Sequence, residues 1–218
     1  QDENDPLMLP PQIPVFPLPG VVLFPNVFLP LHIFEPRYRA MVSDALSGDR
    51  MIGMLLLRPG YDADYEGRPP VYTTGCAGLI THSEALPDGR FNIVLRGIEK
   101  FRVVTEDHSQ PYRVARIEPL PELLPEEQRP TLHQQRLRLE ALMASALERA
   151  GSEPRLPASV ADEDLINALA QYLDFEPIER QALLERDGVL DRCSGLLELL
   201  EMRTLSPHGL HWKGRSVH

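Results

Sequence analysis

The sequence predicts an α+β protein in which a small β-barrel or curled sheet precedes a bundle of four helices. Between Ile13 and about Leu120, short apolar runs alternate with turn residues, which is typical of folds built from many short strands. Three prolines then stand within seven residues, from Pro119 to Pro125, and beyond them apolar residues recur at helical spacing. We therefore expect a disordered lead-in over 1–12, a barrel domain with one helix over 13–121, a helical bundle over 122–205 and a flexible tail over 206–218.

The first strand-rich segment, from Ile13 to Phe34, is apolar and interrupted by proline. Proline fixes φ and removes a backbone donor, so no central strand or helix can run through this segment unbroken. We expect short, kinked strands that turn corners, or an extended apolar segment held by the rest of a barrel. The prolines also exclude a membrane-spanning helix, although the segment is long enough for one. They stand at Pro14, Pro17, Pro19, Pro25 and Pro30.

Later strands are marked by apolar or alternating runs between turn residues. Pro87–Arg90 predicts a turn, and Gly97 separates two alternating runs that we interpret as two strands. The predicted strands cover residues 51–57, 71–81, 91–95, 101–104 and 112–117.

Helices are predicted from apolar stripes bounded by proline and glycine. Pro36 suits the first helical position, and the helix that it opens ends at Gly48. In the bundle, a long helix with apolar residues from Leu132 to Leu147 ends at Gly151. Three further helices cover residues 165–173, 177–188 and 189–200.

The composition argues against a nucleic-acid or membrane-surface protein. The 218 residues carry a formal charge of −10, and both partners need a positive field. No run of Lys and Arg marks a basic patch. Cys76 and Cys193 lie far apart without metal-ligand spacing, which favours small buried thiols in a reducing compartment. With no secretory signal visible at the acidic amino terminus, we expect a cytoplasmic protein.

Catalytic motifs are not evident. The sequence contains no Gly-x-x-x-x-Gly-Lys-Ser/Thr loop, no Gly-x-Gly-x-x-Gly and no Gly-x-Ser-x-Gly. His32 is favoured as a core or rim histidine over a catalytic base, and Asp162-Glu163-Asp164 as charges that complement a helix dipole over a metal or acid–base site. His208, His211 and His218 are favoured as solvated tail residues over a metal site. We predict no cofactor and no metal, and an unrecognised hydrolase site stays open.

The proline-rich segment resembles the amino-terminal substrate-binding domain of the ATP-dependent Lon proteases, a family that includes standalone bacterial copies and the Lon-like part of cereblon. The similarity extends over roughly residues 12–203. The residues that carry it are Phe16–Pro25, Leu29–Leu31, Ile33–Tyr38, Pro87–Phe91, Gly97–Val103 and the Gln181-x-Leu183-Leu184-Glu185 pattern.

The resemblance implies a PUA-like β-barrel with an attached helical bundle, and a role in engaging polypeptides that are unfolded or carry degradation signals. The sequence ends where a full Lon protease would continue into its ATPase and Ser-Lys protease domains, so the resemblance carries over neither unfolding nor proteolysis. The cysteine-rich zinc portion of cereblon is also missing, so no zinc is expected. We therefore predict a protein of the standalone type that is not an enzyme.

The leading hypothesis is a non-catalytic polypeptide-binding module. We expect an apolar groove between barrel and bundle, with Phe34, Arg37, Tyr38 and Met41 as contact residues, because they lie where the proline-rich segment meets the first helix. The alternative that Phe34, Tyr38 and Met41 are core residues stays open. The alternative function is RNA binding, which PUA-like barrels often perform and which the acidic charge disfavours. The oligomeric state is not predicted.

Overall fold

The computed structural model describes residues 7–149 and 159–204. The chain divides into two compact units between Pro121 and Glu122, and each unit is described here by itself. Residues 1–6 of the predicted lead-in, the predicted helix end at Gly151 and the predicted tail over 206–218 lie outside the described residues.

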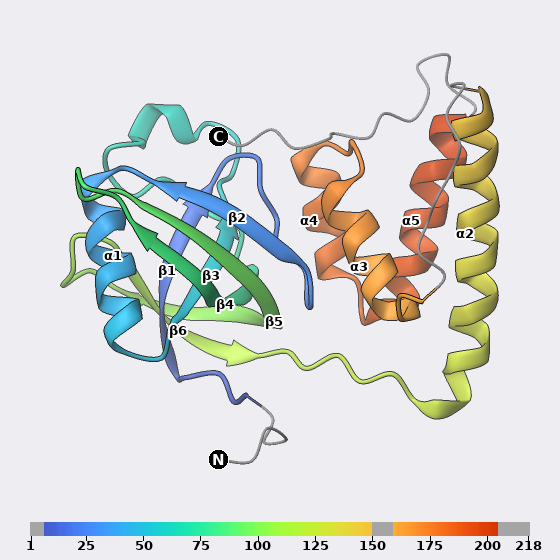
Figure 1. Ribbon diagram of the computed structural model, residues 1–218, viewed down its shortest axis with the longest axis horizontal. Helices are drawn as coiled ribbons and strands as arrows, with labels where there is room; N and C mark the ends of the chain where they lie inside the picture. Colours follow the sequence, from blue (N-terminus) through green and yellow to red (C-terminus); the bar gives the residue numbers. More distant parts are fainter. Residues whose placement is uncertain (1–6, 150–158, 205–218) are drawn as a thin grey trace. The chain divides into compact units, whose positions relative to one another are not determined.

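The first unit is a mixed sheet of six strands with one α-helix (Figure 1). The strand order is β2-β5-β4-β3-β1-β6, and β6 also pairs with β5, the second strand of this order, while β2 pairs with β5 alone. β1 and β3 are parallel, and the other neighbours are antiparallel. The elements are β1 (Gln12–Leu18), β2 (Phe28–Ile33), α1 (Pro36–Ser47), β3 (Met51–Leu56), the 3₁₀ turn η1 (Tyr61–Asp64), β4 (Thr74–Ala85), β5 (Phe91–Asp107) and β6 (Arg113–Pro119).

Three prolines of the opening segment, Pro14, Pro17 and Pro30, lie where a strand is paired on one side. β1 pairs with β6 over residues 12–15 and with β3 over residues 15–18, so Pro14 and Pro17 each face one partner strand. Pro30 lies in β2, which pairs with β5 and ends the strand order. Because a proline lacks a ladder donor, these positions let the segment be both extended and proline-rich.

β5 runs unbroken from Phe91 to Asp107, so the prediction of two strands separated by Gly97 is wrong. Gly97 is needed for a close backbone approach: a Cβ there would lie 2.0 Å from the Phe24 carbonyl oxygen. The turn that crosses β5 at this point is held by hydrogen bonds from Asn26 N–H to the Gly97 carbonyl (2.8 Å) and from Gly97 N–H to the Val27 carbonyl (2.9 Å).

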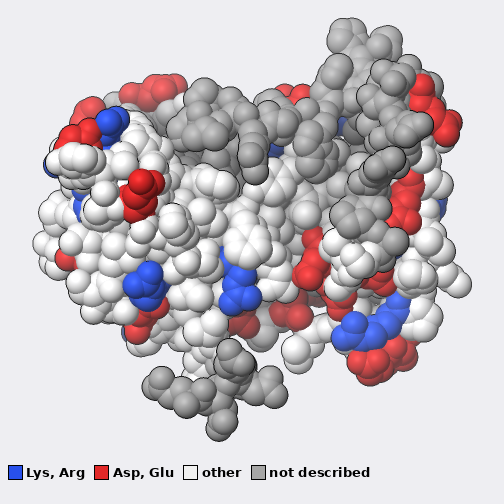
Figure 2. Space-filling view, viewed as in Figure 1, with Lys and Arg blue, Asp and Glu red and all other residues white. Residues whose placement is uncertain are grey.

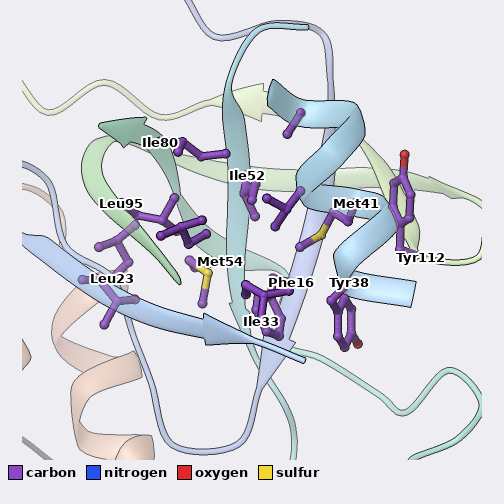
Figure 3. Packing of buried hydrophobic residues seen from close by; sticks show 14 of the residues in the cluster. Phe16, Leu23, Ile33, Tyr38, Met41, Ile52, Met54, Ile80, Leu95 and Tyr112 are labelled. Atoms are coloured by element: carbon purple, nitrogen blue, oxygen red, sulfur yellow. The ribbon is translucent and has the colours of Figure 1, made fainter. Parts of the chain in front are cut away.

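One core cluster of this unit lies between α1 and the sheet (Figure 3), and a second consists of strand residues around Phe101. α1 begins with Pro36 at its first turn and buries one face, because its apolar residues recur at helical spacing. Tyr38 stacks on Phe16 of β1 with ring centroids 4.5 Å apart. The buried members of α1 are Tyr38, Met41, Val42 and Ala45.

The second unit consists, over its described residues, of four α-helices and the 3₁₀ turn η2 (Glu126–Gln128). α5 packs against each of the other three helices. α4 begins with a capping box in which Glu176 and Glu179 each bond the other's backbone N–H, and Pro177 stands in its first turn. The helices are α2 (Arg129–Arg149), α3 (Asp162–Tyr172), α4 (Pro177–Glu185) and α5 (Val189–Thr204). In neither described range, 7–149 or 159–204, is a helix long and apolar enough to cross a membrane.

Candidate functional site

The candidate site lies in the first unit, at the junction of β2 and α1. β2 ends with Ile33 buried, and the alternation of a strand then places Phe34 in solvent, where 57% of its surface is exposed. Its ring stacks near His32 with centroids 6.1 Å apart. An exposed phenylalanine held at the end of a strand offers an apolar contact to a partner.

The structure divides the four predicted contact residues between surface and core. Phe34 is exposed and Arg37 is partly exposed. Met41 is fully buried against the sheet, and Tyr38 keeps 6% of its surface exposed. Met41 therefore supports the site from beneath, while the edge of Tyr38 still lines a cavity.

Arg37 ties the start of α1 to the loop that contains η1. It donates hydrogen bonds to the carbonyl oxygens of Tyr65 (3.2 Å) and Gly67 (3.4 Å), and its Nε lies 3.3 Å from Oε2 of Glu35. The Tyr65 hydroxyl donates to the other Glu35 oxygen at 2.7 Å. That hydrogen bond, with burial, raises the pKa of Tyr65 to about 12. Arg37 and Glu35 together hold the loop at Tyr65 and Gly67 near the start of the helix.

A cavity of about 200 Å³ opens between this loop, the start of α1, the end of β1 and the start of β6. Two tyrosine rings and three prolines form part of its wall, and three arginines supply its polar groups. The lining residues are Pro17, Arg37, Tyr38, Glu66, Gly67, Arg68, Pro69, Pro111, Tyr112 and Arg113.

Arg113 is the most buried of the three arginines, with 7% of its surface exposed. Its Nη2 donates to the Pro69 carbonyl, and its Nη1 lies 3.7 Å from Oε1 of Glu106 without a hydrogen bond. Burial lowers the pKa of Arg113, the charge of Glu106 raises it, and the positive charges of Arg68 and Arg37 lower it further. The cavity wall therefore contains a partly dehydrated guanidinium whose charge Glu106 offsets in part.

Arg68 adds a second incompletely bonded guanidinium. Its Nη2 donates to the His108 carbonyl at 3.2 Å. Its Nη1 is buried and has no hydrogen-bond acceptor among the described residues. Since buried polar groups in proteins are nearly always hydrogen-bonded, two such nitrogens around one cavity require an explanation.

Sequence reasoning missed Arg68, Tyr112 and Arg113. Arg68 and Arg113 stand 45 positions apart, and no local motif joins them. A signal existed in β6, where Arg113 shares the buried phase of the strand with Ala115 and Ile117. The other buried positions of this strand are apolar, so a charged residue at a buried position is the signal that sequence analysis could have used to find the site.

The other predicted site candidates have structural partners. His32 lies 2.7 Å, Nδ1 to Oδ1, from Asn92 on the paired strand β5. Asp162 and Glu163 stand in the first turn of α3 and form ion pairs with Arg136 (2.8 Å) and Arg129 (2.9 Å), as charges at a helix start do. His208, His211 and His218 lie outside the described residues, and within the described ranges no three His, Cys, Asp or Glu side chains are grouped to hold a metal.

The fold defined by this sheet and the helices is that of Lon N-terminal domains. The Lon N-terminal domain protein from Xanthomonas campestris covers 86% of this chain and is itself covered to 97%, with a TM-score of 0.60 and 24% identity. The N-terminal domain of the Lon protease of the Mycobacterium avium complex covers 87% of this chain, with a TM-score of 0.60 and 16% identity.

The family follows from the sequence match. The model of the ATP-dependent protease La (LON) substrate-binding domain matches residues 12–202, and the chain belongs to this family. The Lon similarity read from the proline-rich segment is thereby confirmed.

The curated relatives are much longer than this chain, which matches only part of each of them. The Lon protease of Geobacter metallireducens is 29% identical over 198 residues, which is 85% of this chain and 23% of the relative. The Lon protease of Cytophaga hutchinsonii is 24% identical over 207 residues, which is 91% of this chain and 25% of the relative. The chain thus spans about a quarter of the length of these relatives.

The charge distribution and these comparisons offer nothing in favour of the RNA-binding alternative. On the face shown in Figure 2, Lys and Arg lie in separate small groups, and most of these groups stand beside Asp or Glu. Nucleic-acid surfaces instead require a continuous basic patch or stripe.

Proposed function

We propose that this chain is a non-catalytic module that binds polypeptides, in particular unfolded segments or segments that carry a degradation signal. Membership in the substrate-binding domain family supports a binding role, and the protease activity of the longer relatives is not part of the proposal. Within the same proposal, the closed strand pairings form a PUA-like barrel, the four described helices of the second unit form a bundle, and the protein acts in the cytoplasm.

The observation that carries the proposal is Phe34, an exposed aromatic side chain three positions before Arg37, which lines the cavity. Phe34 would bury apolar area against the partner, at about 25 cal/mol per Å². Arg37 holds the loop 61–69 through its two carbonyl hydrogen bonds, so the cavity that Arg37 lines exists before a partner arrives. A preformed surface loses less conformational entropy on binding. The overall charge of −10 favours segments that are basic or uncharged.

The test measures the affinity of the chain for a permanently unfolded, fluorescently labelled model protein. We expect micromolar binding that Phe34→Ser weakens about tenfold, which corresponds to about 1.4 kcal/mol, an ordinary value for an aromatic anchor. The matched control is Val104→Ser, since Val104 is another exposed apolar residue of the sheet unit, 48% exposed and outside the cavity lining. Binding no stronger than to a folded control protein would refute the proposal, and equal losses in both variants would remove Phe34 from the site.

A further inference from the structure

The cavity beside α1 presents buried cationic nitrogens that the protein itself leaves without hydrogen bonds. Arg113 Nη1 and Arg68 Nη1 are both buried, and neither donates to an acceptor within residues 7–149 or 159–204. Both side chains line the same cavity, and each is anchored through its other terminal nitrogen to a backbone carbonyl, of Pro69 and of His108. Each guanidinium is therefore anchored at one terminal nitrogen, while the other makes no hydrogen bond; in Arg113 this second nitrogen also lies 3.7 Å from Glu106.

The surrounding charges select a monoanion over a more highly charged group. Three arginines line the cavity, and Glu66 lines it with them. Behind the arginines, Glu35 pairs with Arg37 and Glu106 lies 3.7 Å from Arg113. Three carboxylates thus offset three guanidinium groups, which suits a singly charged carboxylate better than a phosphate dianion. The planar carboxylate also matches the fork geometry of arginine.

We propose that this cavity binds the C-terminal carboxylate of a polypeptide, together with its last side chain. The inference rests on the proposed polypeptide-binding function and adds the chemical group that is recognised. A volume of about 200 Å³ is below the roughly 300–1,000 Å³ of pockets for drug-sized ligands, so the cavity suits a chain end rather than a segment that enters and leaves. Tyr38, Tyr112 and the prolines provide an apolar wall for the last side chain.

The position of Phe34 agrees with this orientation of the bound chain. Phe34 precedes Arg37 by three residues, and Arg37 lines the cavity. Three extended residues span at most about 10 Å, so the residues that precede a bound chain end can reach the Phe34 ring. The same site then binds the terminal carboxylate of the partner in the cavity and contacts, through Phe34, an apolar residue a few positions earlier in the partner.

The experiment compares two forms of one short peptide that is uncharged apart from its termini, contains two apolar residues near its end and carries a fluorophore at its amino terminus. One form has a free C-terminal carboxylate, and the other has a C-terminal amide. We expect the carboxylate form to bind the full chain about tenfold more tightly, because only this form carries a negative charge and offers two acceptor oxygens to the guanidinium donors. The same apolar side chains are present in both forms, so the ratio of the two affinities isolates the carboxylate.

Variants then test whether the preference for the carboxylate form over the amide form comes from the cavity. Arg68→Gln and Arg113→Gln should each reduce the ratio to near one, and Arg102→Gln should leave it unchanged. Arg102 is the matched control because it is an exposed arginine of the same sheet that pairs with Glu118 at 3.4 Å and does not line the cavity. Circular dichroism identifies a variant that fails to fold. Arg68 is only partly buried, so its variant provides the test if the variant of buried Arg113 unfolds.

Four other outcomes would contradict the carboxylate proposal, and each points to a different reason. Equal binding of both peptide forms would overturn the carboxylate inference and leave the polypeptide-binding proposal intact. If neither form binds while the unfolded model protein does, the cavity is not a chain-end site. If an amidated peptide with an internal glutamate binds as tightly as the free carboxylate, recognition is not terminal. If inorganic phosphate displaces the peptide at lower concentration than acetate does, the site is a phosphate site.

Discussion

Two buried arginines, one in each unit, are held in opposite ways. In the helical unit, the side chain of Arg192 is completely buried and each of its three nitrogens has a hydrogen-bond acceptor. Nε bonds the Leu183 carbonyl at 3.0 Å, Nη1 bonds Asn167 at 2.8 Å, and Nη2 lies 2.7 and 2.9 Å from the two oxygens of Glu122. Arg113 in the sheet unit has one hydrogen bond to Pro69 and a carboxylate at 3.7 Å.

The difference separates a structural arginine from one that is available to a ligand. Arg192 joins α5 to the end of α4, to α3 and to the chain segment that enters the helical unit. Protein acceptors therefore take the place of water around its guanidinium group. Arg113 is also buried, yet its Nη1 makes no hydrogen bond and its side chain lines a cavity. Burial alone therefore does not distinguish the two roles, whereas the count of satisfied donors does.

The largest expected effect is the loss of Arg192. Arg192→Met should lower the free energy of unfolding of the helical unit by about 3–5 kcal/mol, because the mostly buried Glu122 carboxylate loses its ion pair with the buried guanidinium. Urea unfolding followed by circular dichroism at the helix band measures the change. Arg138→Met is the matched control: Arg138 pairs with Glu201 on the surface of the same unit, and its loss should cost less than about 1 kcal/mol. A cost for Arg192→Met as small as the control's would show that the buried pair is not a stabilising link.

A smaller effect is expected for Arg113. Arg113→Met should cost about 1–2 kcal/mol, because one hydrogen bond from a charged donor is lost while the desolvation of the guanidinium and its repulsion with Arg68 are relieved. The measurement is urea unfolding followed by tyrosine fluorescence, which reports mainly on the sheet unit. A loss as large as that of Arg192→Met would make Arg113 a structural residue and would abolish the contrast.

The fold could be predicted in outline because its signals are local. The prolines of β1 and β2, the apolar stripe of α1 and the helical stripes after Pro125 depend on residues near one another in sequence. Gly97 was misread for the opposite reason. In the sequence, Gly97 looks like a break between two strands. A glycine is required there because the Phe24 backbone, 73 positions earlier in the chain, packs closely against it.

Only the part of the candidate site that lies within one short segment of the chain could be predicted from the sequence. Phe34 and Arg37 were identified because they stand at a strand end and a helix start in one short segment. Arg68 and Arg113 come together because β6 and the loop after η1 meet, which is a tertiary event without a sequence motif. The same limit explains Met41: helical spacing places it on an apolar face, and only the fold decides that this face is covered.

The smallest expected effect concerns Tyr112, which lines the cavity and whose hydroxyl donates to Asp44 on α1. Burial and that hydrogen bond raise the pKa of Tyr112 to about 12, from about 10 in the unfolded chain. Below pH 10 both states keep the proton, and Tyr112→Phe should cost about 1 kcal/mol, the net value of one hydrogen bond. Between pH 10 and 12 the unfolded state loses the proton first, so the advantage of tyrosine over phenylalanine shrinks as pH rises.

Urea unfolding of both proteins from pH 7 to 11 measures this difference. Tyr65 and Cys193, whose pKa values are also raised to about 12, lower the stability of both proteins alike, so their contribution cancels in the comparison. Tyr61→Phe is the control, because Tyr61 belongs to the loop region but does not line the cavity. A difference between wild type and Tyr112→Phe that stays constant to pH 11 would mean that Asp44 does not hold the Tyr112 proton. The arginine cavity would then lack the link to α1 that keeps this wall in place.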